Sequence, residues 1–192
     1  MPTQSHKIEQ LSAAVQPAVD ICLLKAQSYV EDSTYDELFL HYEASARELI
    51  ERATGRVTAQ AQYAVYLDDY PNRDFRFTHH PISSIESIEA LVLDEWTLVP
   101  AETYSLGRGH RVQQGVRLRE GQSWMGHDGG ADSVRISYTA GLAEPMQVEK
   151  QAIMMLVSHW WENREASIQG TLNEVPLATQ RIIELLKCRR AS

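Results

Sequence analysis

Apolar residues change their spacing twice along this chain of 192 residues, and these two changes limit the folds that it can adopt. Between residues 34 and 53 they recur every three or four positions, as on the buried face of one α-helix. After Gly55 they alternate with other residues, as in the set Tyr63, Val65 and Leu67, which is typical of β-strands. Helical spacing returns after Pro145. The order helix, strands, helix predicts an α+β protein.

Local signals place the helices more closely. Residues 19–30 favour a first short helix, and residues 34–53 a long one, with Thr34 and Glu37 at capping-box spacing and Gly55 at the left-handed C-cap position. After Pro145 the apolar residues cover more than half of the helical circumference, which predicts a central helix. A last helix opens at Pro176 and ends in basic residues.

The middle of the chain predicts a small β-rich unit. Besides the alternation at 63–67, strand candidates lie at 75–78, 85–92, 97–100, 104–107, 115–119 and 133–138, with turn-forming residues between them. The glycine-rich segment 121–132 has little to bury, and we expect a mobile hairpin tip or loop there.

We therefore expect a helical core formed by N- and C-terminal helices, with a small β-rich insertion between them. The expected divisions are an N-terminal tail (1–18), a helical part of the core (19–56), the β-rich insertion (57–141) and C-terminal helices that complete the core (142–192). The roles of the tail and of segment 121–132 stay open.

Composition excludes several classes of protein. Apolar residues make up 43% and charged residues 23%, which is typical of a folded domain and not of a disordered chain. The formal charge of −8 argues against general affinity for nucleic acid. Cys22 and Cys188 form no metal or disulfide pattern, which fits a reducing compartment. Residues 1–10 lack the apolar region of a signal peptide, and the apolar run 152–161 is too short to cross a membrane.

Sites for chemistry are weakly indicated. His79 and His80 lie near three aspartates, but neighbouring residues of a strand point to opposite faces and cannot easily share a metal ion. His159 and Glu162 form a single HxxE pair, whereas di-metal bundles use this pair twice. No nucleophile motif is present. We expect no catalytic residue, no metal and no cofactor; a small enzyme would instead bring His79, His159 and acidic residues together in one cleft.

The adjacent tryptophans Trp160 and Trp161 allow two interpretations. Large aromatic side chains are usually buried, so at least one ring is expected in the core. The two rings point roughly 100° apart around the helix. Both can be covered only if the helix is enclosed on two sides, for which a neighbouring subunit is one source. Aromatic residues and arginine are enriched in protein interfaces, so Trp160, Trp161 and Arg164 are our candidates for a subunit interface.

Several segments, taken in order, resemble the head-to-tail connector (adaptor) proteins of long-tailed bacteriophages, prophages and related gene-transfer particles. They are ARELIERATGR (46–56), HPISSIESIEAL (80–91), VRISYTAGL (134–142), AIMMLVSHWWENRE (152–165) and VPLATQRIIELLKCRR (175–190). The resemblance covers residues 19–190, and it rests on the order and spacing of these pieces. The chain departs from the usual pattern in residues 1–18 and 121–132.

The resemblance implies a structural protein of the virion neck, made in the bacterial host cytoplasm, that is not an enzyme. Such proteins form a ring of about twelve copies beneath the portal protein and extend the channel to the tail. Double-stranded DNA passes through this channel without sequence recognition, and the next neck or tail-completion protein binds below. Carried over to this chain, docking on the portal falls to Ile182, Ile183, Leu186, Lys187, Arg189 and Arg190.

Alternatives remain at this point. Another neck or tail-completion component ranks second to the connector, and a small cytosolic enzyme ranks third. A stand-alone binding module would be monomeric and would need no second exposed apolar surface.

Overall fold

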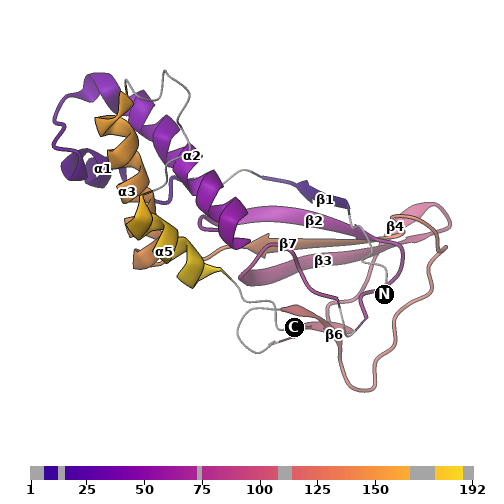
Figure 1. The fold of residues 1–192 in the computed structure, drawn as a ribbon. Helices are drawn as coiled ribbons and strands as arrows, with labels where there is room; N and C mark the ends of the chain where they lie inside the picture. Colours follow the sequence, from indigo (N-terminus) through magenta and orange to yellow (C-terminus); the bar gives the residue numbers. More distant parts are fainter. Residues whose placement is uncertain (1–6, 13–15, 73–74, 108–113, 165–175, 188–192) are drawn as a thin grey trace. The chain divides into compact units, whose positions relative to one another are not determined.

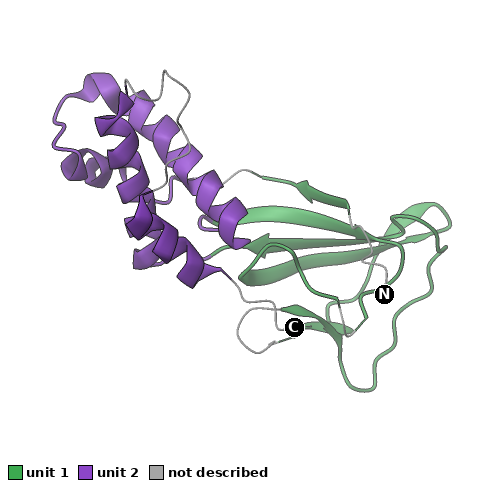
Figure 2. Ribbon diagram, viewed as in Figure 1, with its two compact units in different colours: residues 1–15, 60–141 green, residues 16–59, 142–192 purple. Residues whose placement is uncertain are grey.

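The computed structural model describes residues 7–12, 16–72, 75–107, 114–164 and 176–187 (Figure 1). It confirms the α+β class, with a β-sheet that lies in chain order between N- and C-terminal helical parts. The chain divides into two compact units, and each contains segments that are far apart in the sequence (Figure 2). Unit 1 holds Met1–Val15 and Gln60–Gly141, and unit 2 holds Gln16–Ala59 and Leu142–Ser192.

Unit 1 is built on a five-stranded antiparallel sheet. Its strands, in spatial order, are β1 (Lys7–Gln10), β2 (Ala61–Leu67), β7 (Val134–Ala140), β3 (Ile82–Val92) and β4 (Glu95–Leu98). A separate two-stranded sheet pairs β5 (Tyr104–Gly107) with β6 (Gly115–Leu118). The outer strands β1 and β4 therefore form the two edges of the larger sheet.

The two faces of the sheet differ in polarity because paired residues share a face. Val65, Ile136 and Ile88 lie opposite one another on β2, β7 and β3 and are buried. On the other face, Arg135 donates from Nε to Glu89 at 2.9 Å. The guanidinium of Arg135 also lies 4.8 Å from the ring centroid of Trp96. Unit 1 thus has one apolar face and one polar face.

Aromatic side chains fill the core of unit 1. The Tyr138 ring contacts Phe77 at a centroid distance of 4.5 Å and Tyr63 at 5.7 Å. The ring of His79 stacks on Tyr63 at 4.1 Å, and its Nδ1 lies 3.2 Å from the Tyr138 hydroxyl. Because burial disfavours the imidazolium, the pKa of His79 lies below its usual value, and burial likewise raises the pKa of Tyr138. His79 is thus a core residue.

Unit 2 consists of packed helices. They are α1 (Ile21–Gln27), the 3₁₀ turn η1 (Ser33–Tyr35), α2 (Asp36–Thr54), α3 (Gln147–Glu162) and α5 (Leu177–Leu186). Helix α3 contacts α1, α2 and α5, as its broad apolar surface predicts for a central helix. Ala152, Ile153, Leu156 and Val157 of α3 are fully buried, together with Phe39 and Ile50 of α2.

The ends of α2 test the local predictions. Gly55 is the C-cap of α2 at φ 71°, a left-handed conformation, and its N–H donates to the Glu51 carbonyl, so this prediction is confirmed. The prediction of a capping box at Thr34 and Glu37 is wrong. The Asp32 carboxylate accepts from the N–H of Thr34 and caps η1, while α2 begins one turn later without a side-chain cap.

Two strand assignments also differ from expectation. Residues 75–78 do not form a strand; the side chains of Phe75 and Phe77 enter the core from irregular backbone. Lys7–Gln10, in the region that we expected to be a tail, instead form β1 by pairing with β2. The other strands lie within a few residues of their predicted positions.

Segment 121–132 contains no helix or strand but makes specific contacts. Trp124 stacks on Tyr70 at 4.6 Å. The Asp128 carboxylate accepts from the N–H groups of Leu93 and Asp94, both at 2.9 Å. These two residues form the β3–β4 turn at φ 53° and 63°, where non-glycine residues are strained. The loop that we expected to be mobile therefore holds this turn in place.

Three glutamates of α2 and α3 hold the segments that enter and leave unit 2, and two of them, Glu43 and Glu149, are buried. Glu43 accepts from the Ala18 N–H at 2.8 Å, and Glu51 accepts from the Thr58 N–H at 2.7 Å. Glu149 accepts from the Met146 N–H at 3.0 Å and pairs with Arg56 at 2.8 Å. Each carboxylate thus satisfies backbone donors near a point where the chain passes between the two units.

We predict that Glu43→Gln changes how stability depends on pH. Burial raises the pKa of Glu43 above its usual value of 4.5, so the folded chain binds this proton more tightly than the unfolded chain. The protonated Glu43 therefore stabilises the folded chain fully below pH 4.5, and this contribution is lost as pH rises through the folded-state pKa. Urea unfolding between about pH 4.5 and 8 should show the variant gaining stability relative to the native chain as pH rises.

Glu48→Gln on the same helix is the matched control, because it removes an equal charge from an exposed side chain. Parallel pH curves for the native chain and Glu43→Gln would contradict the assignment of a buried, proton-binding carboxyl.

Candidate protein interface

Both tryptophans of α3 contact aromatic residues in the preceding part of unit 2. The Trp161 ring lies 5.0 Å from Tyr35 in an edge-on arrangement and 4.8 Å from Phe39. The Trp160 ring meets the edge of Tyr42 at 5.9 Å. The chain itself therefore supplies cover for both rings, and each remains half-buried.

A patch of aromatic and basic groups remains accessible at this end of α3. Arg164 is exposed, and its guanidinium carbon lies 3.9 Å from the Trp161 centroid and 5.8 Å from that of Tyr35. We call Tyr35, Trp160, Trp161 and Arg164 the aromatic end of α3. Planar rings beneath a guanidinium give a large contact surface whose side chains are already ordered, a combination that suits protein recognition.

Helix α5 presents different residues from those that we selected. Ile183 and Thr179 are buried toward the helices of their own unit, and α5 contacts both α2 and α3. Ile182 and Leu186 are half-buried, and Lys187 is exposed. The remaining docking candidates, Arg189 and Arg190, lie outside the described residues.

The exposed apolar residues of α5 are Leu177 and Leu185, which are 77% and 82% accessible. Neither leucine is among the docking candidates chosen from the sequence, although α5 carries apolar residues around most of its circumference. This wide distribution of apolar residues around the helix is the sequence signal that could have identified Leu177 and Leu185. A leucine that remains this exposed on an ordered helix is a candidate contact with another protein.

The titratable groups offer little for catalysis. His159 lies at the end of α3 beside Asn163, whereas His79 is stacked in the aromatic core of unit 1. Among the described residues, no group of three His, Cys, Asp or Glu side chains could hold a metal ion.

Ser133, His127 and Asp69 have the residue types of a hydrolase triad but not its geometry. His127 Nε2 lies 3.0 Å from Asp69, and Nδ1 lies 3.2 Å from the Ser133 hydroxyl. However, Nδ1 also accepts from the Gly129 N–H, and the Ser133 hydroxyl is buried and donates to the Asp68 carbonyl. The serine is neither accessible nor directed at the base, so the group is a structural network.

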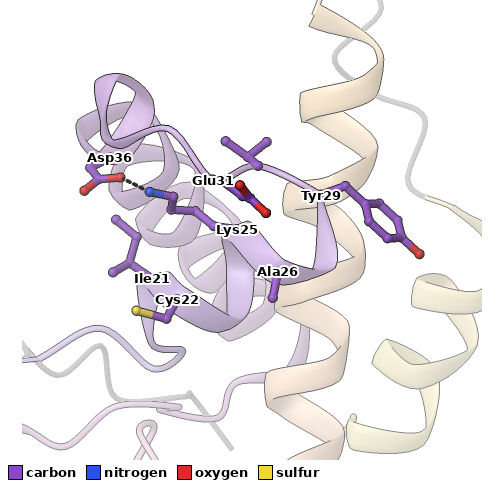
Figure 3. A pocket seen from close by; sticks show the side chains of 8 residues that line it. Ile21, Cys22, Lys25, Ala26, Tyr29, Glu31 and Asp36 are labelled. Carbon is purple, nitrogen blue, oxygen red and sulfur yellow. Dashed lines mark hydrogen bonds and ion pairs between the residues drawn. The ribbon is translucent and has the colours of Figure 1, made fainter.

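A surface hollow of about 570 Å³ lies beside α1, with Lys25 and Cys22 in its lining (Figure 3). Asp36 fixes the ammonium of Lys25 at 2.8 Å, and the Tyr29 ring points away from both lining residues. A hydrogen bond with Asp20 raises the pKa of the exposed Cys22 thiol, which makes it less nucleophilic at neutral pH. The hollow contains no activated group among its lining residues.

No helix in the described segments combines the length and apolar character that a membrane span requires.

Comparison with solved structures reveals close similarity of fold. A chain in the neck of an empty GTA particle, computed with C6 symmetry, matches with a TM-score of 0.77 at 18% identity, over 97% of each chain. A chain in the virion of a native gene transfer agent (GTA) particle matches with a TM-score of 0.76 at 18% identity, over 96% of this chain and 97% of the other.

A further chain, from the neck of a native GTA particle computed with C12 symmetry, matches with a TM-score of 0.72 at 19% identity, over 97% of each chain. At these identities the likeness concerns the fold. No protein-family profile and no curated protein sequence matches the chain.

We predict that Trp161→Ala destabilises the isolated chain, because the ring packs on Tyr35 and Phe39 of the same molecule. The expected loss is about 2 kcal/mol, below the cost for a fully buried tryptophan. Arg164→Ala should cost about 0.5 kcal/mol, because its guanidinium is exposed. Urea unfolding measures both. If neither substitution lowered the free energy of unfolding measurably, the aromatic end of α3 would not be packed as described.

Proposed function

We propose that this chain is a structural neck protein of a phage-like particle, a head-to-tail connector whose copies form a ring beneath the portal protein. The observation that supports this most is the fold match over 97% of both chains to a protein in a GTA neck. A match of this extent leaves little of either chain to carry a different architecture. The order of the sequence segments that resemble connector proteins also led to the hypothesis of a connector.

Ring formation requires contact patches on each copy, and the chain has accessible patches that can serve. In a closed ring each copy uses two different patches, one for each neighbour. Related necks were computed with C6 and C12 symmetry, which favours a ring of about twelve copies for this chain. We assign one patch to the aromatic end of α3, with Trp160, Trp161 and Arg164, because it combines exposed area with side chains already ordered by α2.

We assign portal docking to α5 and the residues that follow it. Its buried side, through Ile183, fixes the helix to unit 2, while Leu177 and Leu185 remain accessible for a partner. Lys187, and Arg189 and Arg190 beyond the described residues, add positive charge that can steer association with an acidic partner surface. The next neck or tail-completion protein would bind another surface of the ring.

The charge of the chain suits a DNA channel. At −8 per copy, a ring of about twelve copies is strongly acidic, which disfavours tight binding of duplex DNA and is compatible with its passage without sequence recognition. This proposal places the protein in the virion neck after synthesis in the host cytoplasm. A different neck or tail-completion role is the second candidate, favoured by the same fold matches, and binding to the portal distinguishes the two.

The test is portal binding by surface variants of the full chain. Leu185→Asp replaces an exposed side chain of α5, so it should leave folding intact while weakening co-sedimentation with the cognate portal protein by about tenfold or more. Gln180→Asp, at another exposed position of α5, is the matched control for added charge.

Circular dichroism and urea unfolding confirm that both variants fold. Unchanged portal binding by Leu185→Asp and by Leu177→Asp would remove α5 as the docking element. Absence of portal binding by the native chain would favour the second candidate.

A further inference from the structure

Both edges of the five-stranded sheet are open within the described part of the chain. β1 pairs only with β2, and β4 pairs only with β3 (Figure 1). Open edges present unpaired N–H and C=O groups, which proteins commonly protect with lysine, proline or a covering element. β4 has the sequence EWTL, with Trp96 40% and Leu98 61% accessible. This edge is therefore poorly protected against pairing.

The hydrogen-bonding pattern shows which residues of each edge point outward. The N–H of Leu11 donates to Gln62 of β2, and the N–H of Val99 donates to Ile88 of β3, both at 2.8 Å. Because backbone groups alternate in direction along an antiparallel pair, Ile8 and Gln10 of β1 point outward. Trp96 and Leu98 of β4 point outward for the same reason.

The β4 edge is also held rigidly in position. Asp128 binds both N–H groups of the strained Leu93–Asp94 turn, from which β4 begins. Arg135 lies over the ring of Trp96 and keeps that side chain on the polar face. A strand fixed in this way is prepared for a partner, because little conformational entropy remains to be lost on pairing.

We infer that β4 of one copy pairs with β1 of the next copy in the ring, so that the sheets join into a continuous belt. This inference rests on the proposed ring. Strands alternate in direction across the five-stranded antiparallel sheet, so β1 and β4 run in the same direction. Neighbours in a ring of twelve differ by a rotation of about 30°, which keeps the two strands close to parallel. Adjacent strands in ordinary sheets already differ by about 20–25°.

Parallel pairing also matches the two faces of the sheet. Ile8 shares the apolar face with Val65, and Thr97 shares it with Ala90. If Ile8 lies opposite Thr97 of the neighbour, its outward N–H and C=O meet the outward groups of Trp96 and Leu98. An antiparallel β4–β1 pair would set Ile8 opposite Trp96 and join the apolar face to the polar one.

Side-chain chemistry at this register is favourable. It brings Lys7 of β1, whose ammonium lies 4.9 Å from the Tyr66 centroid of its own chain, beside the partly exposed ring of Trp96 on the polar face, and a cation near an indole is attractive. Glu9 then lies beside Leu98, and neither edge places two like charges opposite each other. The partner that fits each edge is therefore a second copy of this chain.

Disulfide cross-linking tests the register. In a background with Cys22 and Cys188 replaced by serine, the double variant Ile8→Cys with Thr97→Cys places thiols on paired strands about 4.8 Å apart. Oxidised rings, assembled from pure protein or recovered in neck particles, should give a ladder of covalent multimers on a non-reducing gel. Lys7→Cys with Thr97→Cys is the matched control, since those side chains lie on opposite faces and should give no ladder.

Proline substitution tests the backbone bonds. Ile8→Pro and Leu98→Pro each remove an outward N–H that no strand in the described part of the chain uses, which an edge strand tolerates. Each should weaken ring assembly by about tenfold, while Ile8→Ala and Leu98→Ala, which keep the N–H, should assemble more strongly than the proline variants. Circular dichroism of the monomer verifies folding.

The outcomes separate this inference from the proposed function. Rings that form without the Ile8–Thr97 ladder, or cross-links that stop at dimers, would overturn the strand pairing and leave the neck assignment intact. Failure of the native chain to enter rings in neck particles would contradict both.

Discussion

The helical unit depends on the enclosure of α3 by helices from both ends of the chain. α2 precedes the sheet and α3 follows it, yet the two pack together and bury the apolar side chains that neither could bury alone. The pairing of Arg56 with the buried Glu149 reinforces this contact where the chain enters α3. Because α3 is completed by α2, the segment between them must leave unit 2 and return to it. This requirement explains the arrangement of a β unit inserted into a helical unit.

The same enclosure determines which surfaces remain for partners. The broad apolar face of α3 is covered by α1, α2 and α5 of its own chain, so it is not by itself an assembly surface. The accessible surfaces include smaller and more specific patches: the aromatic end of α3, the two outward leucines of α5, and the two edges of the sheet. These patches lie on ordered elements, which limits the entropy lost on association.

Features set by local interactions were predictable from the sequence, and those set by distant pairing were not. α2 and its end at Gly55 follow from helical spacing and one backbone conformation. β1, in contrast, has the sequence KIEQ, without a local strand signal, and exists because β2 offers an edge. Phe75 and Phe77 alternate as a strand would, but residues 75–78 do not form one, and the Phe77 N–H instead donates to the Gln114 carbonyl. The proposed interface residues were only partly predictable: Trp161 and Arg164 follow from their residue types, whereas the exposure of Leu185 depends on how α5 packs.

We propose that copies of this chain lie at the junction of head and tail. Electron microscopy of particles labelled with gold-conjugated antibodies against the folded chain tests it most directly. We expect gold at the head–tail junction, and no gold at the junctions of particles assembled without the chain. Gold on the capsid shell or the tail tip, or confined to material that never joins particles, would contradict it.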